Sequence, residues 1–332
     1  MSSTKLNTAD PSRILICGLG SIGCRHVRLV HEQLPSTSIA VVRSGFGSKQ
    51  SEEAIIDQHF SRLEEAIEWK PDAAIIASPA SCHQQQALSL AREGIPLLLE
   101  KPVGTGGEPA ESWVELRKRS DRLPMLVGYV LRYDPCAAVL KENIQSERLG
   151  KVLEADFYCG SWLPDWRPKS NYRQSVSAQR SLGGGVLLEI SHELDLAHFF
   201  LGSMKLRYSC LRQSRLLELD VEDQALLVTA SDSCPLITFR LNFCTRPARR
   251  MISMRFEKGE AFWDILAGTV SVRIHGQEGE YFQSQKQTDD LYRIQLEHFV
   301  SCLHGELPVC SLSDGLRVLD IVTQAKADSH EW

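Results

Sequence analysis

The segment RILICGLGSIG, residues 13–23, constrains the fold of this chain more strongly than any other stretch. A short apolar run ends directly in Gly18 and Gly20, and Gly23 falls in the first turn of a predicted helix. Glycines at these spacings permit a tight turn and let backbone N–H groups at a helix N-terminus approach a pyrophosphate. The segment therefore predicts a strand, a turn and a helix that bind a dinucleotide; the alternative is a glycine-rich turn without a ligand.

Strand-like runs alternate with helical patterns through the N-terminal part of the chain. The runs are RILICGLG, SIAVVRS, DAAIIASP, PLLLEKP and MLVGY, and helix-capping patterns begin at Ser61 and Ser81. This alternation predicts a Rossmann-type α/β domain, in which helices cover both faces of a doubly wound parallel sheet. From residue 151 onward, strand-like segments follow one another with alternating apolar and polar residues. They predict an α+β domain with a large open, mainly antiparallel sheet.

We therefore expect two domains, for which a chain of 332 residues is long enough. The first spans residues 1–127 and begins with a flexible N-terminus at 1–12. The second spans residues 128–332 and provides the substrate-binding and oligomer contacts. A helical pattern at 312–329 is predicted to pack back on the first domain.

The composition excludes several classes of protein. A net charge of -5 and the lack of a long basic block argue against nucleic-acid binding. No run approaches the ~20 apolar residues that cross a membrane, and the N-terminus lacks the apolar core of a signal peptide. Ten scattered cysteines without a CxxC pair are typical of reduced thiols. We expect a cytoplasmic protein without disulfides or a metal site.

The second predicted strand ends in Val42, Arg43 and Ser44. An acid at this position binds the ribose 2′-hydroxyl in NAD-binding domains of this kind. An arginine beside a hydroxyl instead suits a 2′-phosphate, which favours NADP over NAD. In the alternative, Arg43 is a surface residue or stacks on adenine, and the cofactor is NAD.

The segment LLLEKPVG, residues 97–104, delivers two opposite charges to the end of an apolar strand. Ligands of doubly wound sheets lie beyond the carboxyl ends of the strands. Glu100 and Lys101 are therefore predicted to line the cofactor crevice, with a surface salt bridge as the alternative. Pro102 gives the strand a rigid exit, and a cis Lys101–Pro102 bond is compatible with such a turn.

A second concentration of chemistry lies in SLGGGVLLEISHELDLAHFFLG. In a helix over 189–200, Glu189, His192 and Asp195 would lie three residues apart and share one face. A histidine between acids can act as an oriented general acid or base. The same trio lacks a fourth ligand for a metal site. In the simplest alternative the acids are helix-surface charges beside a hydrogen-bonded histidine.

The segment 162–180 is long, irregular and rich in aromatic and basic residues. Long loops in compact domains are often functional, and tryptophan faces and arginine forks suit sugar rings and anions. The alternative is an oligomer contact. The candidate substrate contacts here are Trp166, Tyr172, Arg173 and Arg180.

Together these motifs resemble the Gfo/Idh/MocA family of NAD(P)-dependent oxidoreductases over nearly the whole chain. The matching pieces are GxGxxG at 18–23, SPASCHQQQALSLAREGIPLLLEKP at 78–102, GYVLRYDP at 128–135, the segment 183–195 and SDGLRVLDIVTQAKADS at 313–329. The resemblance implies a Rossmann domain followed by a domain whose open sheet forms homodimers or homotetramers. It also implies hydride transfer at a hydroxyl or carbonyl carbon of a sugar, cyclitol or related small molecule.

The resemblance also implies roles for single residues. Lys101 and His192 match the positions that handle the proton, and Asp195 matches a position three residues further on. Arg132, in GYVLRYDP, is placed with the substrate contacts. The cofactor-binding positions matched by the family motifs are Gly18, Gly20, Ser21, Ile22, Gly23, Ser78, Pro79, His83, Glu100 and Lys101.

One departure concerns the acid before His192. Family members commonly carry an aspartate four residues before this histidine, whereas this chain has Leu188 there and Glu189 three before. The segment from Trp162 to Asp195 is similar to members of bacterial surface-sugar pathways, which suggests a nucleotide sugar or an acidic sugar as substrate. The alternatives are a glycoside hydrolase that recycles bound NAD and a non-catalytic NAD(P)-binding sensor.

Overall fold

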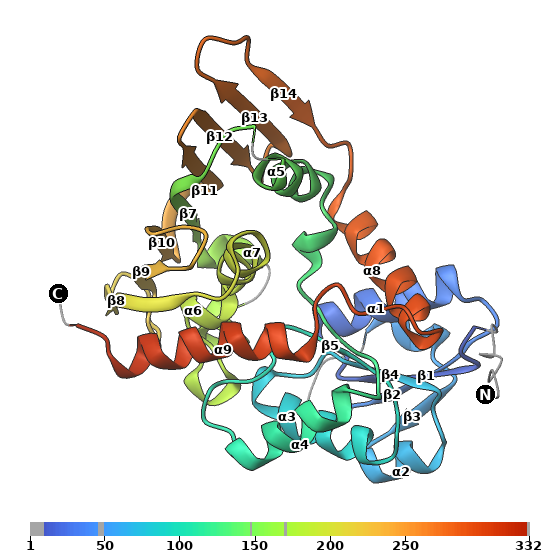
Figure 1. Cartoon of the computed structure of the whole chain (residues 1–332). Helices are drawn as coiled ribbons and strands as arrows, with labels where there is room; N and C mark the ends of the chain where they lie inside the picture. Colours follow the sequence, from blue (N-terminus) through green and yellow to red (C-terminus); the bar gives the residue numbers. More distant parts are fainter. Residues whose placement is uncertain (1–9, 46–49, 147, 169–170, 331–332) are drawn as a thin grey trace. The chain divides into compact units, whose positions relative to one another are not determined.

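The computed structural model describes residues 10–45, 50–146, 148–168 and 171–330. Most of the predicted flexible N-terminus, residues 1–9, lies outside this range. Two compact units form: Met1–Tyr129 with Thr288–Gly315, and Val130–Gln287 with Leu316–Trp332 (Figure 1). The sequence predicted one boundary near residue 127, whereas the contacts group the later segment Thr288–Gly315 with the N-terminal unit.

The first unit contains a six-stranded parallel sheet with the strand order β3-β2-β1-β4-β5-β6. The order reverses between β1 and β4, so the topological switch point of this doubly wound sheet lies there. Its strands are β1 (Arg13–Cys17), β2 (Ser38–Val42), β3 (Gln58–Phe60), β4 (Ala73–Ile76), β5 (Leu97–Leu99) and β6 (Met125–Val127). This confirms the predicted Rossmann-type domain.

Helices cover both faces of this sheet. Figure 1 shows α1 (Ser21–Gln33) and α8 (Thr288–Leu303) on one face, and α3 (Ala80–Arg92) and α4 (Ala110–Ser120) on the other. A further short helix, α2 (Leu63–Glu68), precedes β4. The β1 residues from Ile14 to Cys17 are fully buried, because a parallel sheet covered on both faces exposes neither side of its central strands.

The second unit is built on an eight-stranded sheet with the order β14-β13-β12-β11-β7-β10-β9-β8. Its strand pairs are antiparallel except for β7 with β10. The strands are β7 (Val152–Trp162), β8 (Lys205–Arg212), β9 (Gln224–Ala230), β10 (Ile237–Asn242), β11 (Cys244–Phe256), β12 (Gly259–Asp264), β13 (Thr269–Ile274) and β14 (Glu280–Gln283). The predicted open, mainly antiparallel sheet is confirmed.

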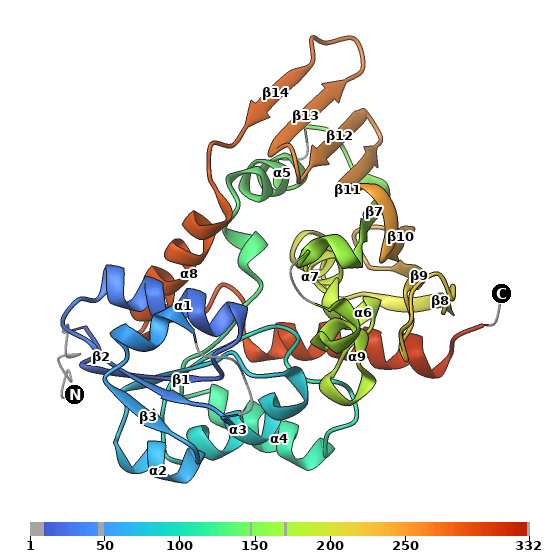
Figure 2. The same ribbon diagram turned by 180° about the vertical axis from the view of Figure 1, so that it is seen from behind.

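One face of the large sheet forms the core of its unit. Alternate residues such as Phe157, Phe239 and Ile252 point into this core and are buried. The helices of the unit are α5 (Pro135–Gln145), α6 (Val186–Glu189), α7 (His192–Leu201) and α9 (Leu312–Ala327), the last of which begins in the first unit. Figure 2 shows α6 and α7 beside β9 and β10. The predicted packing of residues 312–329 on the first domain stays a prediction.

A continuous helix over 189–200, on which a shared face of Glu189, His192 and Asp195 depended, does not form. Helix α6 ends at Glu189 and α7 begins at His192, because Ile190 leaves the helical conformation with φ -100° and ψ 31°. Glu189 and His192 therefore belong to different helices, and only His192 and Asp195 share α7.

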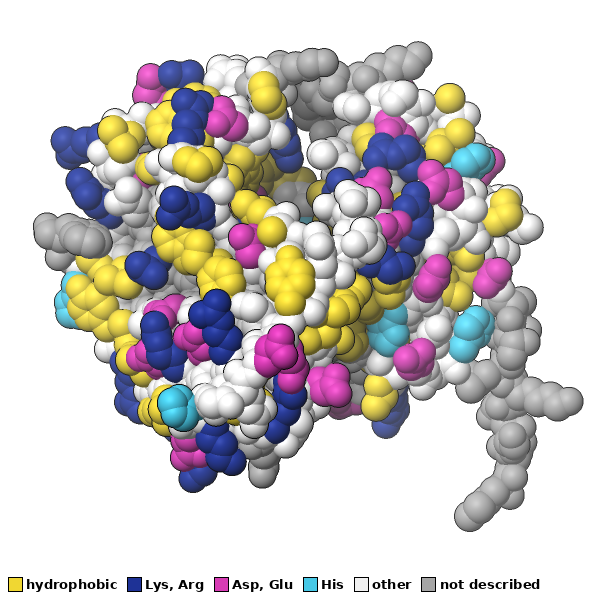
Figure 3. Space-filling view, turned by 90° about the horizontal axis from the view of Figure 1, so that it is seen from above, with side chains coloured by type: hydrophobic (Ala, Val, Ile, Leu, Met, Phe, Trp, Pro, Cys, Tyr) yellow, Lys and Arg dark blue, Asp and Glu magenta, His cyan; other side chains and the backbone are white. Residues whose placement is uncertain are grey.

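The surface carries mixed charges. Basic, acidic and apolar side chains are interspersed over the face drawn in Figure 3. Among the described residues, no helix has the length and apolar content required to cross a membrane.

Candidate active site

The turn between β1 and α1 has the shape that a dinucleotide pyrophosphate requires. Gly18 has φ +95°, and a Cβ there would lie 2.8 Å from the carbonyl oxygen of Ala77. A Cβ on Gly23 would lie 2.1 Å from the carbonyl oxygen of Gly18, whereas Gly20 faces open space. No side chain of the described residues caps α1, so the N-terminal N–H groups of this helix can bind an anion. The turn therefore fits a dinucleotide cofactor.

Three segments of the first unit meet at one edge of its sheet. The glycine turn follows β1, the Ser78–Pro79 loop follows β4, and Lys101 comes two residues after β5. The three strands are adjacent and parallel, so their carboxyl ends lie at the same edge. Lys101 is half-buried, and its bond to Pro102 is cis.

His83, predicted among the cofactor-binding residues, is a buried residue of α3. Only 2% of its surface is exposed. Its Nδ1 lies 2.8 Å from the carbonyl oxygen of Pro102, and its Nε2 lies 2.8 Å from that of Ser78. Burial lowers the pKa of His83, while the two carbonyl groups oppose this effect. The buried ring of His83 thus links the loop after β4 to the turn after Lys101 through its two contacts with backbone carbonyl groups.

Glu100 is also buried, which corrects the prediction that it lines the crevice. Its Oε1 lies 2.8 Å from Nε2 of His26, a fully buried residue of α1, and its Oε2 accepts a hydrogen bond from the Lys101 N–H at 3.3 Å. A Cβ on Gly128 would lie 2.9 Å from this carboxylate. Glu100 therefore supports the turn from inside the protein. Of Glu100 and Lys101, only Lys101 is partly accessible to solvent.

Arg43 follows β2, as expected, but an acid already pairs with it. Its Nη1 lies 2.5 Å from Oε1 of Glu53, in the short 3-10 helix Ser51–Ile55, and both side chains are half-buried. The neighbouring Ser44 is exposed. Sequence reasoning did not single out this partner, because Glu53 lies ten residues after Arg43 in a separate element and only folding brings the two side chains together.

A pocket of about 220 Å³ in the second unit collects other predicted residues. His192, Glu189 and Trp166 all line it. Its remaining lining comes from Ile190, Leu266 and the facing segments Cys159–Ser161 of β7 and Ala248–Arg250 of β11. The pocket therefore unites the predicted histidine and its acid with one aromatic residue of the 162–180 segment.

Asp195 and Arg132 are not part of this pocket. They form a buried ion pair in which Nη2 and Oδ1 are 2.7 Å apart and Nε and Oδ2 are 3.0 Å apart. Their side chains are 1% and 3% exposed, respectively. The predictions of a catalytic role for Asp195 and of substrate contact for Arg132 are corrected accordingly: the pair anchors α7, which carries His192, to the segment Val130–Tyr133.

Three further residues that the sequence assigned to substrate lie outside the pocket. Arg173 forms two hydrogen bonds with Glu218, at 2.8 and 2.7 Å, and the Glu218 N–H donates to the Tyr172 hydroxyl at 3.4 Å. Arg180 donates to the carbonyl oxygen of Asp220 at 2.7 Å. These side chains tie the loop to the segment before β9.

Sequence reasoning missed a second pair at the pocket wall. Glu193, one residue after His192, is fully buried, and its Oε1 accepts a hydrogen bond from Nε of Arg250 at 2.6 Å. Arg249 and Arg250 both line the pocket. The only signal available was the basic cluster RPARR, residues 246–250, at the start of a strand-like segment.

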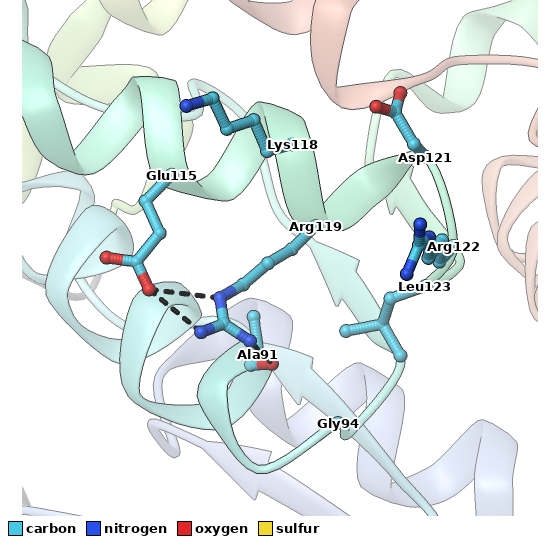
Figure 4. A pocket seen from close by; sticks show the side chains of 8 residues that line it. All are labelled: Ala91, Gly94, Glu115, Lys118, Arg119, Asp121, Arg122 and Leu123. Carbon is cyan, nitrogen blue, oxygen red and sulfur yellow. Dashed lines mark hydrogen bonds and ion pairs between the residues drawn. The ribbon is translucent and has the colours of Figure 1, made fainter.

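A different pocket, of about 540 Å³, lies in the first unit where β5 and β6 begin. Figure 4 shows Glu115 and Arg119 pointing toward one another across it, with their nitrogen and oxygen atoms 3.0 Å apart. Ligands of doubly wound sheets bind at the opposite, carboxyl edge. This pocket therefore has no place in the cofactor site. No group of three or more possible metal ligands occurs among the residues described.

The chain matches two protein-family models and is similar in sequence to known dehydrogenases. A family model described as oxidoreductase family, NAD-binding Rossmann fold, matches residues 12–129, and one described as GFO/IDH/MocA C-terminal domain matches residues 138–282. The chain is 26% identical to inositol 2-dehydrogenase 2 of Saccharopolyspora erythraea over 67% of its own length and 64% of that relative. The alignment therefore spans less than two thirds of that relative.

Other similarities extend over more of the chain. It is 24% identical to scyllo-inositol 2-dehydrogenase (NAD(+)) of Bacillus subtilis, over 93% of this chain and 91% of the relative. The solved structure of levoglucosan dehydrogenase with NADH and levoglucosan superimposes with a TM-score of 0.81 at 16% identity, covering 96% of this chain and 98% of that one. This last similarity shows the shared fold.

Proposed function

Because the chain belongs to the Gfo/Idh/MocA family of oxidoreductases, we propose that it transfers hydride between NAD(P) and a sugar-type substrate. The reacting carbon carries a hydroxyl group in one direction and a carbonyl group in the other. The observation that carries this proposal is the meeting of the glycine turn, the Ser78–Pro79 loop and Lys101 at three adjacent strand ends. The dehydrogenases named among the relatives support a polyol or sugar as substrate.

The chain's own residues have distinct tasks in this reaction. The N–H groups at the start of α1 bind the pyrophosphate, and the bound cofactor supplies the nicotinamide that accepts or donates hydride. We assign the hydroxyl proton of the substrate to Lys101 and His192, with Glu189 as a hydrogen-bond acceptor in the same pocket as His192. The positioning residues are Glu100 and His83 behind Lys101, and Asp195 on the helix of His192.

For the cofactor itself we favour NAD over NADP, which reverses the preference drawn from the sequence. The charge of Arg43 is balanced by Glu53 at 2.5 Å, and a 2′-phosphate beside this carboxylate would be repelled. Titrating the protein with NADH and NADPH, followed by fluorescence, measures both affinities. Glu53→Gln should tighten NADPH binding relative to NADH. Tighter binding of NADPH than NADH by the unaltered protein would restore the original interpretation of Arg43.

We extend the proposal to assembly and location. The outward face of the large sheet carries half-buried or exposed apolar side chains, among them Leu226, Val228 and Phe262. A second copy covering this face would remove them from water. Native mass spectrometry tests this, and a monomer at micromolar concentration would contradict it. Ten free thiols support a cytoplasmic location.

The main test is a substrate panel of inositols, sugars and sugar acids with NAD, monitored by NADH absorbance. Stoichiometric NADH formation is expected, and it separates a dehydrogenase from a hydrolase that only recycles its cofactor. Lys101→Met should lower kcat/KM by roughly 10²–10⁴-fold, the usual contribution of a positioned proton-transfer group, while NADH binding persists. Lys118→Met, on α4, is the matched control. Unaltered turnover by Lys101→Met would refute the assigned role.

A further inference from the structure

The pocket of the second unit is lined by two arginines, Arg249 and Arg250, which the assigned reaction does not use, and by one acid, Glu189. Building on the proposed function, we infer that this pocket binds an anionic substituent, a carboxylate or a phosphate, of the sugar-type substrate. Arg249 is the residue that contacts it. The substrate class is then an acidic monosaccharide rather than a neutral polyol.

The arginines on β11 differ in their pairing with carboxylates. Arg246 binds Asp165, with nitrogen–oxygen distances of 2.8 and 2.6 Å. Arg250 binds Glu193 and Arg255 binds Glu154. Arg249 is the remaining arginine of the strand; it is exposed, it lines the pocket, and no carboxylate among the described residues pairs with it. Its positive charge is therefore available to a ligand in the pocket.

Arg250, the neighbour of Arg249 at the pocket wall, is held in place by a buried acid. Glu193 is fully buried and accepts the Nε–H of Arg250, so the guanidinium is fixed at the pocket wall with its charge balanced inside the protein. Burial and the nearby Glu193 also raise the pKa of the Cys159 thiol, which keeps this lining residue neutral. Of the two lining arginines, only Arg249 lacks a partner carboxylate among the described residues.

The rest of the pocket lining suits a sugar ring. Trp166 donates its indole N–H to the Ser161 hydroxyl at 2.7 Å. Its ring packs edge-on against that of Phe243, with the ring centroids 5.3 Å apart. The indole is thus held as a flat wall against which a sugar ring can stack, while Glu189 and His192 are suited to its hydroxyl groups.

The size of the pocket points the same way. Its volume of about 220 Å³ lies below the roughly 300–1,000 Å³ typical of pockets for drug-sized ligands. A single sugar ring with one small charged group suits such a space. The nucleotide part of a nucleotide sugar would have to lie outside it.

The test compares Arg249→Gln with the unaltered enzyme on matched substrates: D-glucuronate and glucose 6-phosphate against D-glucose and myo-inositol. Losing a charge-assisted hydrogen bond should raise KM for the preferred anionic substrate roughly 10–100-fold more than KM for a neutral one. The preference between the first two substrates shows whether the group is a carboxylate or a phosphate. Arg207→Gln, which alters another exposed arginine of the same sheet outside the pocket, should change neither KM.

The outcomes separate this inference from the proposed function. Turnover of neutral polyols with no preference for acidic analogues, or equal effects of Arg249→Gln on both classes, leaves a dehydrogenase but overturns the anion site. If no sugar is turned over, ligand-observed NMR with D-glucuronate and glucose 6-phosphate still tests the pocket directly. Binding of either that is lost in Arg249→Gln supports the anion site, and binding that is absent or unaffected overturns it.

Discussion

Two buried acids, one in each unit, stand beside the residues to which we assign the proton. Glu100 precedes Lys101 and pairs with His26, and Asp195 lies one helical turn after His192 and pairs with Arg132. The partners differ, however. Arg132 is permanently charged and forms hydrogen bonds through two nitrogens, whereas His26 contributes one ring nitrogen at 2.8 Å.

Lys101 and His192 are therefore supported by ion pairs of different strength. A carboxylate next to a catalytic candidate in sequence looks like a member of the catalytic set, yet both acids face inward. The bidentate pair of Arg132 and Asp195 fixes α7 against the segment Val130–Tyr133 of the same unit. Removing one partner leaves the other buried without its counter-charge. The histidine pair fixes a single turn through one hydrogen bond, so it should cost less to break.

Breaking the arginine pair should give the largest loss of stability. Arg132→Met leaves Asp195 buried without its partner, and we expect the free energy of unfolding to fall by about 3–5 kcal/mol. Urea denaturation followed by circular dichroism measures it. The double variant Arg132→Met/Asp195→Leu should recover part of the loss, because neither charge then remains buried. Arg173→Gln, which breaks an exposed pair, is the control, and a loss of similar size there would contradict the argument.

Removing the histidine partner should cost less. In His26→Leu, Oε1 of the buried Glu100 loses its hydrogen bond, at an expected cost of about 1–3 kcal/mol. Adding Glu100→Gln to this variant should restore some stability, since a neutral amide is easier to bury than a carboxylate. Because Glu100 also accepts from the Lys101 N–H, kcat should fall in His26→Leu. If His26→Leu proves as costly as Arg132→Met, the two supports are equivalent and the comparison fails.

The smallest effect should be a change in pH dependence at His83. Burial lowers the pKa of this group in the folded protein below its ordinary value of 6.5. Above pH 6.5 its contribution to stability is fully present. As the pH falls below 6.5 the unfolded chain takes up the proton first, so stability is lost down to the pKa of the folded state. In His83→Gln the urea midpoint should therefore depend less on pH in this acidic window. Parallel curves of midpoint against pH for the two proteins would contradict this prediction.

Most of the fold could be predicted because its signals are local. The glycine spacing after β1, the apolar runs and the alternation along β9 and β10 each depend on neighbouring residues, and the structure confirms the two kinds of sheet. The break between α6 and α7 was not predicted, because Ile190, where the backbone leaves the helical conformation, is neither a glycine nor a proline.

The candidate site, too, has features that depend on neighbouring residues and features that depend on distant ones. The sequence alone determined which residues come at strand ends and in the glycine turn, since backbone geometry at a turn follows from the residues within it. Which side chains face a pocket and which face inward depends on contacts that form only when distant segments pack together. His26 and Glu100 are 74 positions apart, Arg132 and Asp195 are 63 apart, and Glu193 and Arg250 are 57 apart. The energy of such a pair depends on burial and on a partner brought close by folding, and neither is written in the local sequence.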